Sequence, residues 1–149
     1  MKGIGAVFDC MVFVQAVASR GPAYRCFERV TAIKAPLWMS KDTFAELQHV
    51  LNRSDLRRKL PGLTEERVQA LLHHLGHLAN HVDPVPRTLP FPPDPKDEPY
   101  INLAIEARAE VLLTRDIAIL ALRRADSPLY QALRELHPSL RILLPEEFS

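Results

Sequence analysis

Apolar residues along the chain follow two patterns, short continuous runs and longer segments in which they recur every three or four positions. Continuous runs bounded by polar or turn-forming residues are typical of buried strands, and such strands are expected at 3–8, 36–39, 111–114 and 141–144. The helical spacing predicts helices at 12–33 with a break near Gly21-Pro22, and at 40–51, 64–78, 97–105 and 117–124. Strands that alternate with helices predict an α/β fold with a mostly parallel sheet covered on both faces.

Ser40 is a candidate N-cap, because its hydroxyl can accept a bond from a free backbone N–H at the head of a helix, and Thr64-Glu65-Glu66-Arg67 resembles a helix start. The segment from Asp83 to Pro99 is rich in proline, which lacks an N–H and has a fixed φ, so it is expected to be an extended connector. Too little chain follows it to build a second core. Residues 1–149 are therefore predicted to form a single domain.

Composition favours a globular protein, with 47% hydrophobic and 25% charged residues. No apolar run approaches the roughly 20 residues that span a bilayer, and the apolar stretch before Asp9 is too short for a signal peptide. We therefore expect a cytoplasmic protein without a membrane segment. The formal net charge of +1 predicts that any nucleic-acid site is a local patch. Cys10 and Cys26 match no metal or redox spacing and are expected to be buried thiols.

Acidic residues stand where two predicted strands end. Asp9 follows the first strand and Asp116 follows the strand at 111–114, and ligands of open parallel sheets gather beyond the carboxyl ends of strands. Further acids lie at the start of the intervening helix and on the helix that follows Ser40, namely Asp94, Asp97, Glu98 and Glu46. Carboxylates that share one cleft need a counter-charge, and Mg²⁺ or Mn²⁺ suits an all-oxygen ligand set. Phosphodiester hydrolysis is the chemistry that such a site supports.

Local roles can also explain most of these acids one at a time. Asp97 and Asp116 each precede a helix, where an aspartate caps free N–H groups. Asp94 could begin a turn before Pro95, and Glu46 could be an exposed helix residue. Asp9 is the hardest to explain in this way, because an acid that ends a buried apolar strand is costly unless it is paired or bound to a metal.

Four segments together resemble the PIN-domain family, in particular its bacterial branch of VapC-like ribonucleases that act as toxins of toxin–antitoxin pairs. They are Val7-Phe8-Asp9-Cys10-Met11-Val12-Phe13, Ser40 through Glu46-Leu47, Asp94-Pro95-Lys96-Asp97-Glu98-Pro99-Tyr100-Ile101-Asn102-Leu103-Ala104, and Leu113-Thr114-Arg115-Asp116. They occur in the family's order, and the resemblance covers essentially the whole chain. No one segment is specific, but the combination is.

The resemblance implies a three-layer α/β/α fold and a Mg²⁺/Mn²⁺-dependent endoribonuclease. The family's metal-binding and catalytic acids correspond to Asp9, Glu46, Asp97 and Asp116, and the positions of Asp94 and Glu98 are often acidic in the family. Thr114 matches the family's small hydroxyl residue beside the last aspartate, with Arg115 between them. The resemblance also implies an RNA substrate, a homodimer and a small antitoxin partner.

Met11 departs from the family pattern, in which an asparagine usually stands two residues after the first aspartate. A thioether cannot replace the hydrogen bonds of an amide, and loss of such a supporting group commonly costs ~10–100-fold in activity or metal affinity. This favours an alternative hypothesis, a catalytically weakened PIN scaffold that binds RNA or a partner protein. A haloacid-dehalogenase-type phosphohydrolase is a weaker alternative, since that family usually needs an acid where Met11 stands.

Basic residues and histidines suggest two further sites. The cluster of Arg53, Arg57, Arg58 and Lys59 could bind RNA phosphates, or could form a solvated face. Histidines spaced four residues apart suggest zinc, at positions His73, His77 and His81, with His74 beside them. Helical periodicity places them opposite a leucine stripe, in solvent, and no acid or cysteine completes a ligand set. A zinc site is therefore not expected.

Overall fold

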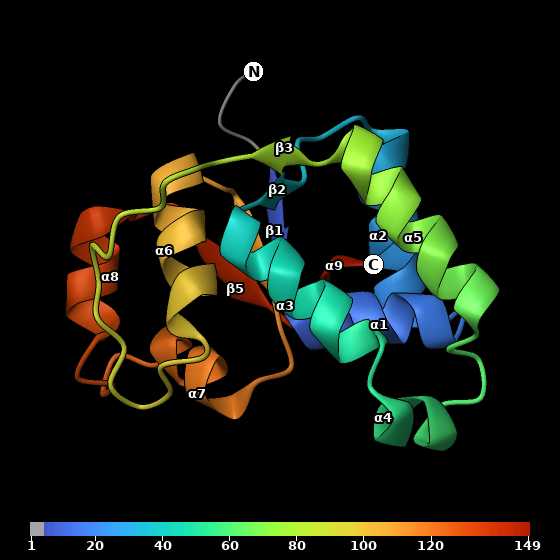
Figure 1. Ribbon diagram of the computed structural model, residues 1–149. Coiled ribbons are helices and arrows are strands. Elements are labelled where there is room, and N and C mark those ends of the chain that lie inside the picture. The colour runs from blue at the N-terminus through green and yellow to red at the C-terminus, as the bar shows by residue number, and fades with distance from the viewer. Residues whose placement is uncertain (1–4) are drawn as a thin grey trace.

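Five short parallel strands form the centre of the computed structural model, which describes residues 5–149 (Figure 1). One sheet has the order β1-β4-β5 and a second pairs β2 with β3; the strands are β1 (Ala6–Phe8), β2 (Trp38–Met39), β3 (Asn80–His81), β4 (Val111–Leu113) and β5 (Arg141–Leu143). A parallel bridge from Ala6 to Leu37, with the Ala6 N–H donating to Pro36 O at 2.9 Å, joins the two sheets. The strands therefore follow the order β3-β2-β1-β4-β5.

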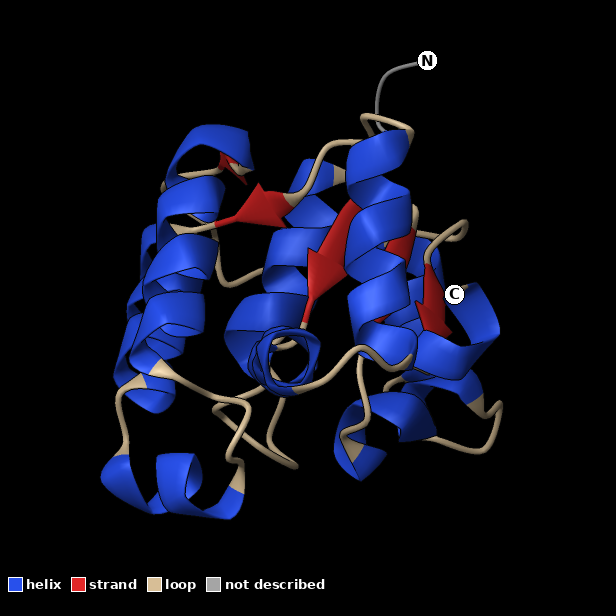
Figure 2. Cartoon of the chain, turned by 90° about the vertical axis from the view of Figure 1, so that its right-hand side faces the viewer, coloured by secondary structure: helices blue, strands red, loops and turns tan. Residues whose placement is uncertain are grey.

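Helices lie on both sides of these strands, as Figure 2 shows. They are α1 (Cys10–Ala18), α2 (Pro22–Ala32), α3 (Lys41–Leu51), α4 (Ser54–Lys59), α5 (Glu65–Leu78), α6 (Glu98–Ala107), α7 (Ile117–Leu120), the 3-10 turn η1 (Ala121–Arg123), α8 (Tyr130–Leu136) and α9 (Pro145–Phe148). Helix α6 contacts β1, β2 and β4, while α1 packs against α2, α3 and α5. The fold is a three-layer α/β/α arrangement, as predicted.

The register between β1 and β4 fixes the position of the residues that follow them. Phe8 pairs with Leu113, and the Asp9 N–H donates to Leu113 O at 2.9 Å. Both strands run in the same direction, so Asp9 and Thr114 leave the sheet side by side. Two segments far apart in sequence are thereby joined at one edge.

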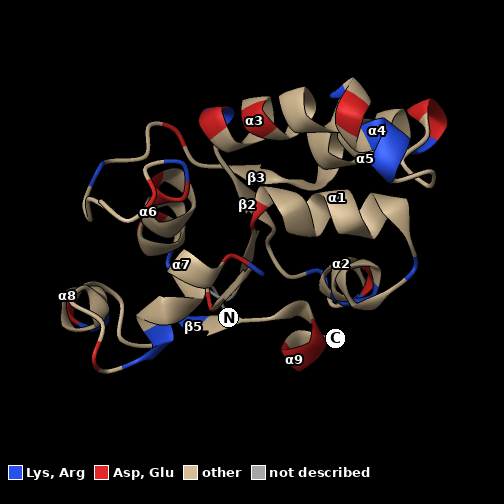
Figure 3. Ribbon diagram, turned by 90° about the horizontal axis from the view of Figure 1, so that it is seen from below, with Lys and Arg blue, Asp and Glu red and all other residues tan. Residues whose placement is uncertain are grey.

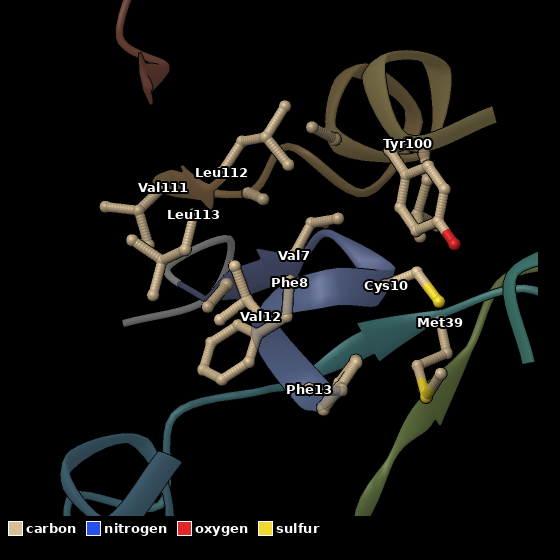
Figure 4. Close-up of a cluster of buried hydrophobic side chains, with 14 of the residues drawn as sticks. Val7, Phe8, Cys10, Val12, Phe13, Met39, Tyr100, Val111, Leu112 and Leu113 are labelled. Carbon is tan, nitrogen blue, oxygen red and sulfur yellow. The ribbon is translucent and has the colours of Figure 1, made fainter. Parts of the chain in front are cut away.

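Side chains of the central strands form the core, drawn in Figure 4. Phe8, Leu112 and Leu113 are almost completely buried, and the rings of Phe8 and Phe13 lie 5.0 Å apart between centroids. Strands covered on both faces need apolar residues at every position, which is why β1 and β4 are continuous apolar runs. Cys10 lies in this core as a buried free thiol.

The predicted elements are present, with bounds that differ from the predicted ones by a few residues. Residues 3 and 4 of the first predicted strand lie outside the described part of the chain, and β1 begins at Ala6. The break predicted near Gly21-Pro22 separates α1 from α2, and Gly21 is the N-cap of α2. Ser40 accepts a bond from the Thr43 N–H at 3.1 Å, which confirms the predicted cap, and at the predicted helix start Thr64 accepts one from the Arg67 N–H at 3.2 Å.

Four elements were not predicted, namely β3, α4, α8 and α9. They have between two and seven residues, and both side chains of β3 are exposed. β3 has no apolar residue, and α4 and α9 have too few to form an apolar run or a helical stripe. Within residues 5–149, no helix is both long and apolar enough to cross a membrane.

Candidate active site

Three aspartates meet at the carboxyl edge of the sheet. Asp9 follows β1, Asp97 precedes α6 and Asp116 follows β4, and one carboxylate oxygen from each lies within 4.8 Å of the other two. Figure 3 shows acidic segments in red where α1 begins, on α6 and on the loop leading into α7. We call these three residues the aspartate cluster. They line a cavity of about 450 Å³, the acidic cleft, together with Glu46 and Asp94.

Asp9 is buried, and hydrogen bonds hold its carboxylate in place. The Thr114 hydroxyl donates to Oδ2 at 2.7 Å, and the Met11 N–H donates to Oδ1 at 3.4 Å. Burial raises the pKa of Asp9 above its usual value, these two hydrogen bonds lower it, and the charges of Asp116 and Glu46 raise it again. The Thr114 hydroxyl also accepts a bond from the Asp116 N–H at 2.9 Å. Thr114 therefore links two members of the cluster, the place predicted for it.

Asp116 caps α7 through one oxygen. Its Oδ1 accepts from the N–H groups of Ala118 at 2.8 Å and Ile119 at 3.4 Å. The capping role suggested by the sequence is thus confirmed. It does not exclude a second role, because the same carboxylate also belongs to the aspartate cluster.

Asp97 differs, because its side chain makes no capping bond to α6. Its Oδ2 is buried and has no hydrogen-bond partner in the described part of the chain. Burial, followed by the charge of Asp116, raises the pKa of Asp97 to about 8. The capping interpretation of Asp97 is therefore wrong. A buried oxygen without a partner is costly in free energy, and a cation in the cluster would remove that cost.

The ligand types of the aspartate cluster fit a hard divalent cation such as Mg²⁺ or Mn²⁺, which prefers carboxylate oxygens. Among residues 5–149, the aspartate cluster is the one set of at least three Asp, Glu, His or Cys residues whose ligand atoms lie close enough together to share a metal ion. The histidines considered for zinc, His73, His74, His77 and His81, are all exposed and form no such group.

Comparison with known families agrees with this geometry. Residues 5–118 match the family model described as PIN domain. The chain belongs to the PIN-domain family. No curated protein and no solved structure matches the sequence. PIN domains are in general nucleases, so the aspartate cluster is the candidate hydrolytic centre of this PIN domain.

The other acids predicted as ligands take different places in the PIN domain. Glu46 lines the acidic cleft, outside the aspartate cluster, and accepts a hydrogen bond from the Tyr100 hydroxyl. Asp94 also lines the cleft, but its Oδ1 accepts from the Lys96 N–H at 2.9 Å, as expected for a turn. Glu46 and Asp94 therefore border the cluster and do not complete it.

Glu98 requires a correction. Its carboxylate pairs with the Arg87 guanidinium at 2.5 Å and accepts from the Phe91 N–H at 2.8 Å, and it does not line the acidic cleft. These contacts lower the pKa of Glu98, the Arg87 bond being the larger cause. Glu98 anchors the connector to α6 in place of the predicted metal-ligand role. Ser40 likewise does not line the cleft, and its contacts are those of a helix cap.

Basic residues reach the acidic cleft from three segments. Arg53, Lys96 and Arg115 all line it. The Arg115 Nε donates to Gln15 Oε1 at 2.7 Å, and its two terminal nitrogens donate to the Glu146 carboxylate at 2.9 and 2.7 Å. Glu146, on helix α9, thus holds the Arg115 guanidinium in place. Lys96, Gln15 and Glu146 were missed by the sequence analysis, although Lys96 lies within the DPKDEPY stretch.

The remaining residues of the predicted basic cluster do not line the cleft. Arg57 donates to Leu51 O and to Glu65, a structural contact between α3, α4 and α5. Arg58 and Lys59 are exposed on α4, which lies at the far end of α3 from α6 (Figures 1 and 3). Of the four residues predicted to bind RNA, Arg53 alone lies at the candidate site.

Proposed function

We propose that this PIN domain is a Mg²⁺- or Mn²⁺-dependent endoribonuclease that hydrolyses RNA phosphodiester bonds in the acidic cleft. The observation that carries the proposal is the buried Asp97 Oδ2, which accepts no hydrogen bond from an N–H or hydroxyl of the described residues and belongs to a carboxylate set shared with Asp9 and Asp116. Folding leaves this costly arrangement in place. A cation held by the three aspartates accounts for it.

The roles of the residues follow from their contacts. Asp9, Asp97 and Asp116 would hold the cation, and Thr114 fixes the spacing of Asp9 and Asp116. When bound, such a cation neutralises phosphate charge and lowers the pKa of a coordinated water. Glu46, oriented by Tyr100 at the border of the cluster, is assigned to position the attacking water by accepting its hydrogen bond.

We assign substrate binding to the three basic side chains that line the acidic cleft. Arg53, Lys96 and Arg115 can contact phosphates on either side of the cleaved bond. This arrangement compensates for the small net charge of +1. The choice of RNA, the toxin role, an antitoxin partner, a homodimer and a cytoplasmic location rest on the resemblance of the four sequence segments to the VapC-like branch.

Cleavage of RNA by the purified chain tests the proposal. We expect cutting with Mn²⁺, none with chelator, and a loss of at least ~100-fold in Asp97→Asn, because removing a group of this kind typically lowers rates by such factors. Asp42→Asn is the matched control, since Asp42 is exposed in the first turn of α3. Cutting by Asp97→Asn at the rate of the control would contradict the proposal.

A second candidate function is a PIN scaffold that binds RNA without cutting it. Met11 favours it, because this side chain lines the acidic cleft and is 41% exposed at the place where the family usually has an asparagine. Calorimetry with Mn²⁺ separates the two candidates when it is combined with the cleavage assay. Tight metal binding without turnover would favour the scaffold, and wild-type cleavage would exclude it.

A further inference from the structure

A second hollow, which we call the apolar pocket, lies beside α7 and has a volume of about 470 Å³. One wall is the end of the proline-rich connector, with Phe91, Pro92 and Pro93, and the opposite wall includes Ala121 and Leu129. Figure 1 shows the connector passing α8 and turning beneath α6 toward α7. The volume is in the range of small-molecule sites.

The apolar pocket adjoins the acidic cleft, because residues that line the two hollows are bonded to each other. Ala118, a pocket residue, donates its N–H to Asp116 Oδ1 at 2.8 Å, so one wall contacts the aspartate cluster directly. On the other wall, Phe91 O accepts from the N–H of Asp94, a cleft residue, at 3.3 Å. Ile117 stands between Asp116 and Ala118 with its side chain 84% exposed.

The chemistry of the two hollows is opposite. The acidic cleft has charged residues and basic side chains suited to phosphates, whereas the apolar pocket has an almost entirely apolar lining. Phe91 is buried beneath the connector wall, while Pro92 and Pro93 are exposed, and the flat ring of a proline suits stacking against an aromatic ring. Arg124 and Asp126 also line the pocket; they pair with each other at 3.2 Å, and both side chains are largely exposed. A flat heterocycle with polar edges matches this lining.

We propose that the apolar pocket binds one nucleobase of the nucleic acid, that of a nucleotide adjoining the phosphate in the acidic cleft. The inference rests on the proposed function and adds a base subsite to it. In a polynucleotide, each charged phosphate lies close to a flat base. The acidic cleft suits the phosphate, and the adjacent apolar pocket suits the base. Stacking of one base contributes about 1–3 kcal/mol in single-strand binding proteins.

The test uses Asp97→Asn, so that RNA is bound without being cut, and oligonucleotides of about eight nucleotides in which each position in turn lacks its base. We expect one abasic position to weaken binding about 10-fold in fluorescence anisotropy. Ala121→Leu, added to fill the pocket, should weaken binding of intact RNA by a similar factor and abolish the effect of that abasic position. Ala70→Leu, in a different hollow between α1, α2 and α5, is the matched control.

Leu129→Ala, which trims the opposite wall, gives an independent variant if Ala121→Leu melts at a lower temperature than its parent. RNA that is cut and bound normally, but with no difference between the pocket variants and Ala70→Leu, overturns the base subsite and leaves the proposed function standing. A dimer lost in Ala121→Leu with unchanged RNA binding assigns the pocket to a second copy and also overturns it. Absence of both cutting and binding overturns the proposed function itself.

Discussion

Asp97 and Asp116 each stand at the head of a helix, yet their carboxylates have different partners. Asp116 Oδ1 accepts two backbone N–H groups of α7, while Asp97 Oδ2 is buried without a partner. Asp97 therefore does not cap its own helix, and its pKa is raised by burial and by the charge of the neighbouring Asp116. Two predictions at the residue scale can be measured, one on the stability of the metal-free protein and one on Met11 in the acidic cleft.

The metal-free protein should lose stability as pH rises. The pKa of Asp97 is raised from 3.8 to about 8 in the folded chain, so folding favours the protonated acid. Its contribution is fully present below the unfolded value and is lost as pH rises through the folded one. We expect the melting temperature in chelator to fall by at least ~4 °C more, between mildly acidic and mildly alkaline buffer, in wild type than in Asp97→Asn.

Parallel melting curves of wild type, Asp97→Asn and Asp42→Asn provide the measurement. Asp42→Asn should follow wild type, because Asp42 is exposed in the first turn of α3. A curve for Asp97→Asn that runs parallel to wild type across this pH range would contradict the pKa assigned to Asp97.

Met11→Asn should increase activity. The side chain lines the acidic cleft two residues after Asp9, where an amide can support a carboxylate or water by hydrogen bonding. We expect kcat/KM to rise about 10-fold at fixed Mn²⁺. Ile33→Asn makes the same change at another exposed apolar residue, in the C-cap of α2, and should have no effect. Equal rates in all three proteins would mean that the family's amide is dispensable here.

At the scale of elements, short segments after the strands build the site. The turn after β4 carries Thr114, Arg115 and Asp116, and α9, which follows β5, supplies Glu146 to Arg115. Helix α9 is itself held by α2, where the Cys26 thiol donates to Pro145 O at 3.2 Å. The four-residue helix α9 thereby fixes the orientation of the Arg115 guanidinium in the acidic cleft.

Glu146→Gln should weaken substrate binding without changing the chemical step. The Glu146 side chain is 51% exposed in its pair with Arg115, and exposed ion pairs contribute at most about 1 kcal/mol. We therefore expect KM to rise by up to ~5-fold with kcat unchanged. Steady-state kinetics against Glu135→Gln, an exposed change on α8, gives the comparison. A fall in kcat with constant KM would show that Glu146 acts on the aspartate cluster instead.

The elements that sequence could predict are those with a pattern long enough to read. The runs that became β1 and β4, each ending near an aspartate, predicted the edge of the sheet and two of its acids. The sequence could not separate Asp97 from Glu98, because adjacent acids at a helix start differ only in the direction of their side chains. Gln15, Tyr100 and Glu146 act through contacts between distant segments, which no local pattern reports.

At the scale of the whole molecule, the aspartate cluster unites three separate segments, so cation binding should stabilise the fold. A ligand at 100 times its dissociation constant stabilises a protein by about 2.7 kcal/mol, or roughly 5–10 °C for a chain of this size. We expect Mn²⁺ to raise the melting temperature of wild type by this amount and that of Asp97→Asn by much less. Equal shifts in the two proteins would place the cation elsewhere.

The bond from Thr114 to Asp9 closes a loop of 105 positions in the chain, which has a consequence for synthesis on the ribosome. Asp9 is made before Asp97 and Asp116, its partners in the aspartate cluster. A nascent chain therefore holds one carboxylate and no assembled site. For the proposed ribonuclease, a chain that stops before Asp97 and Asp116 have been made would lack the aspartate cluster.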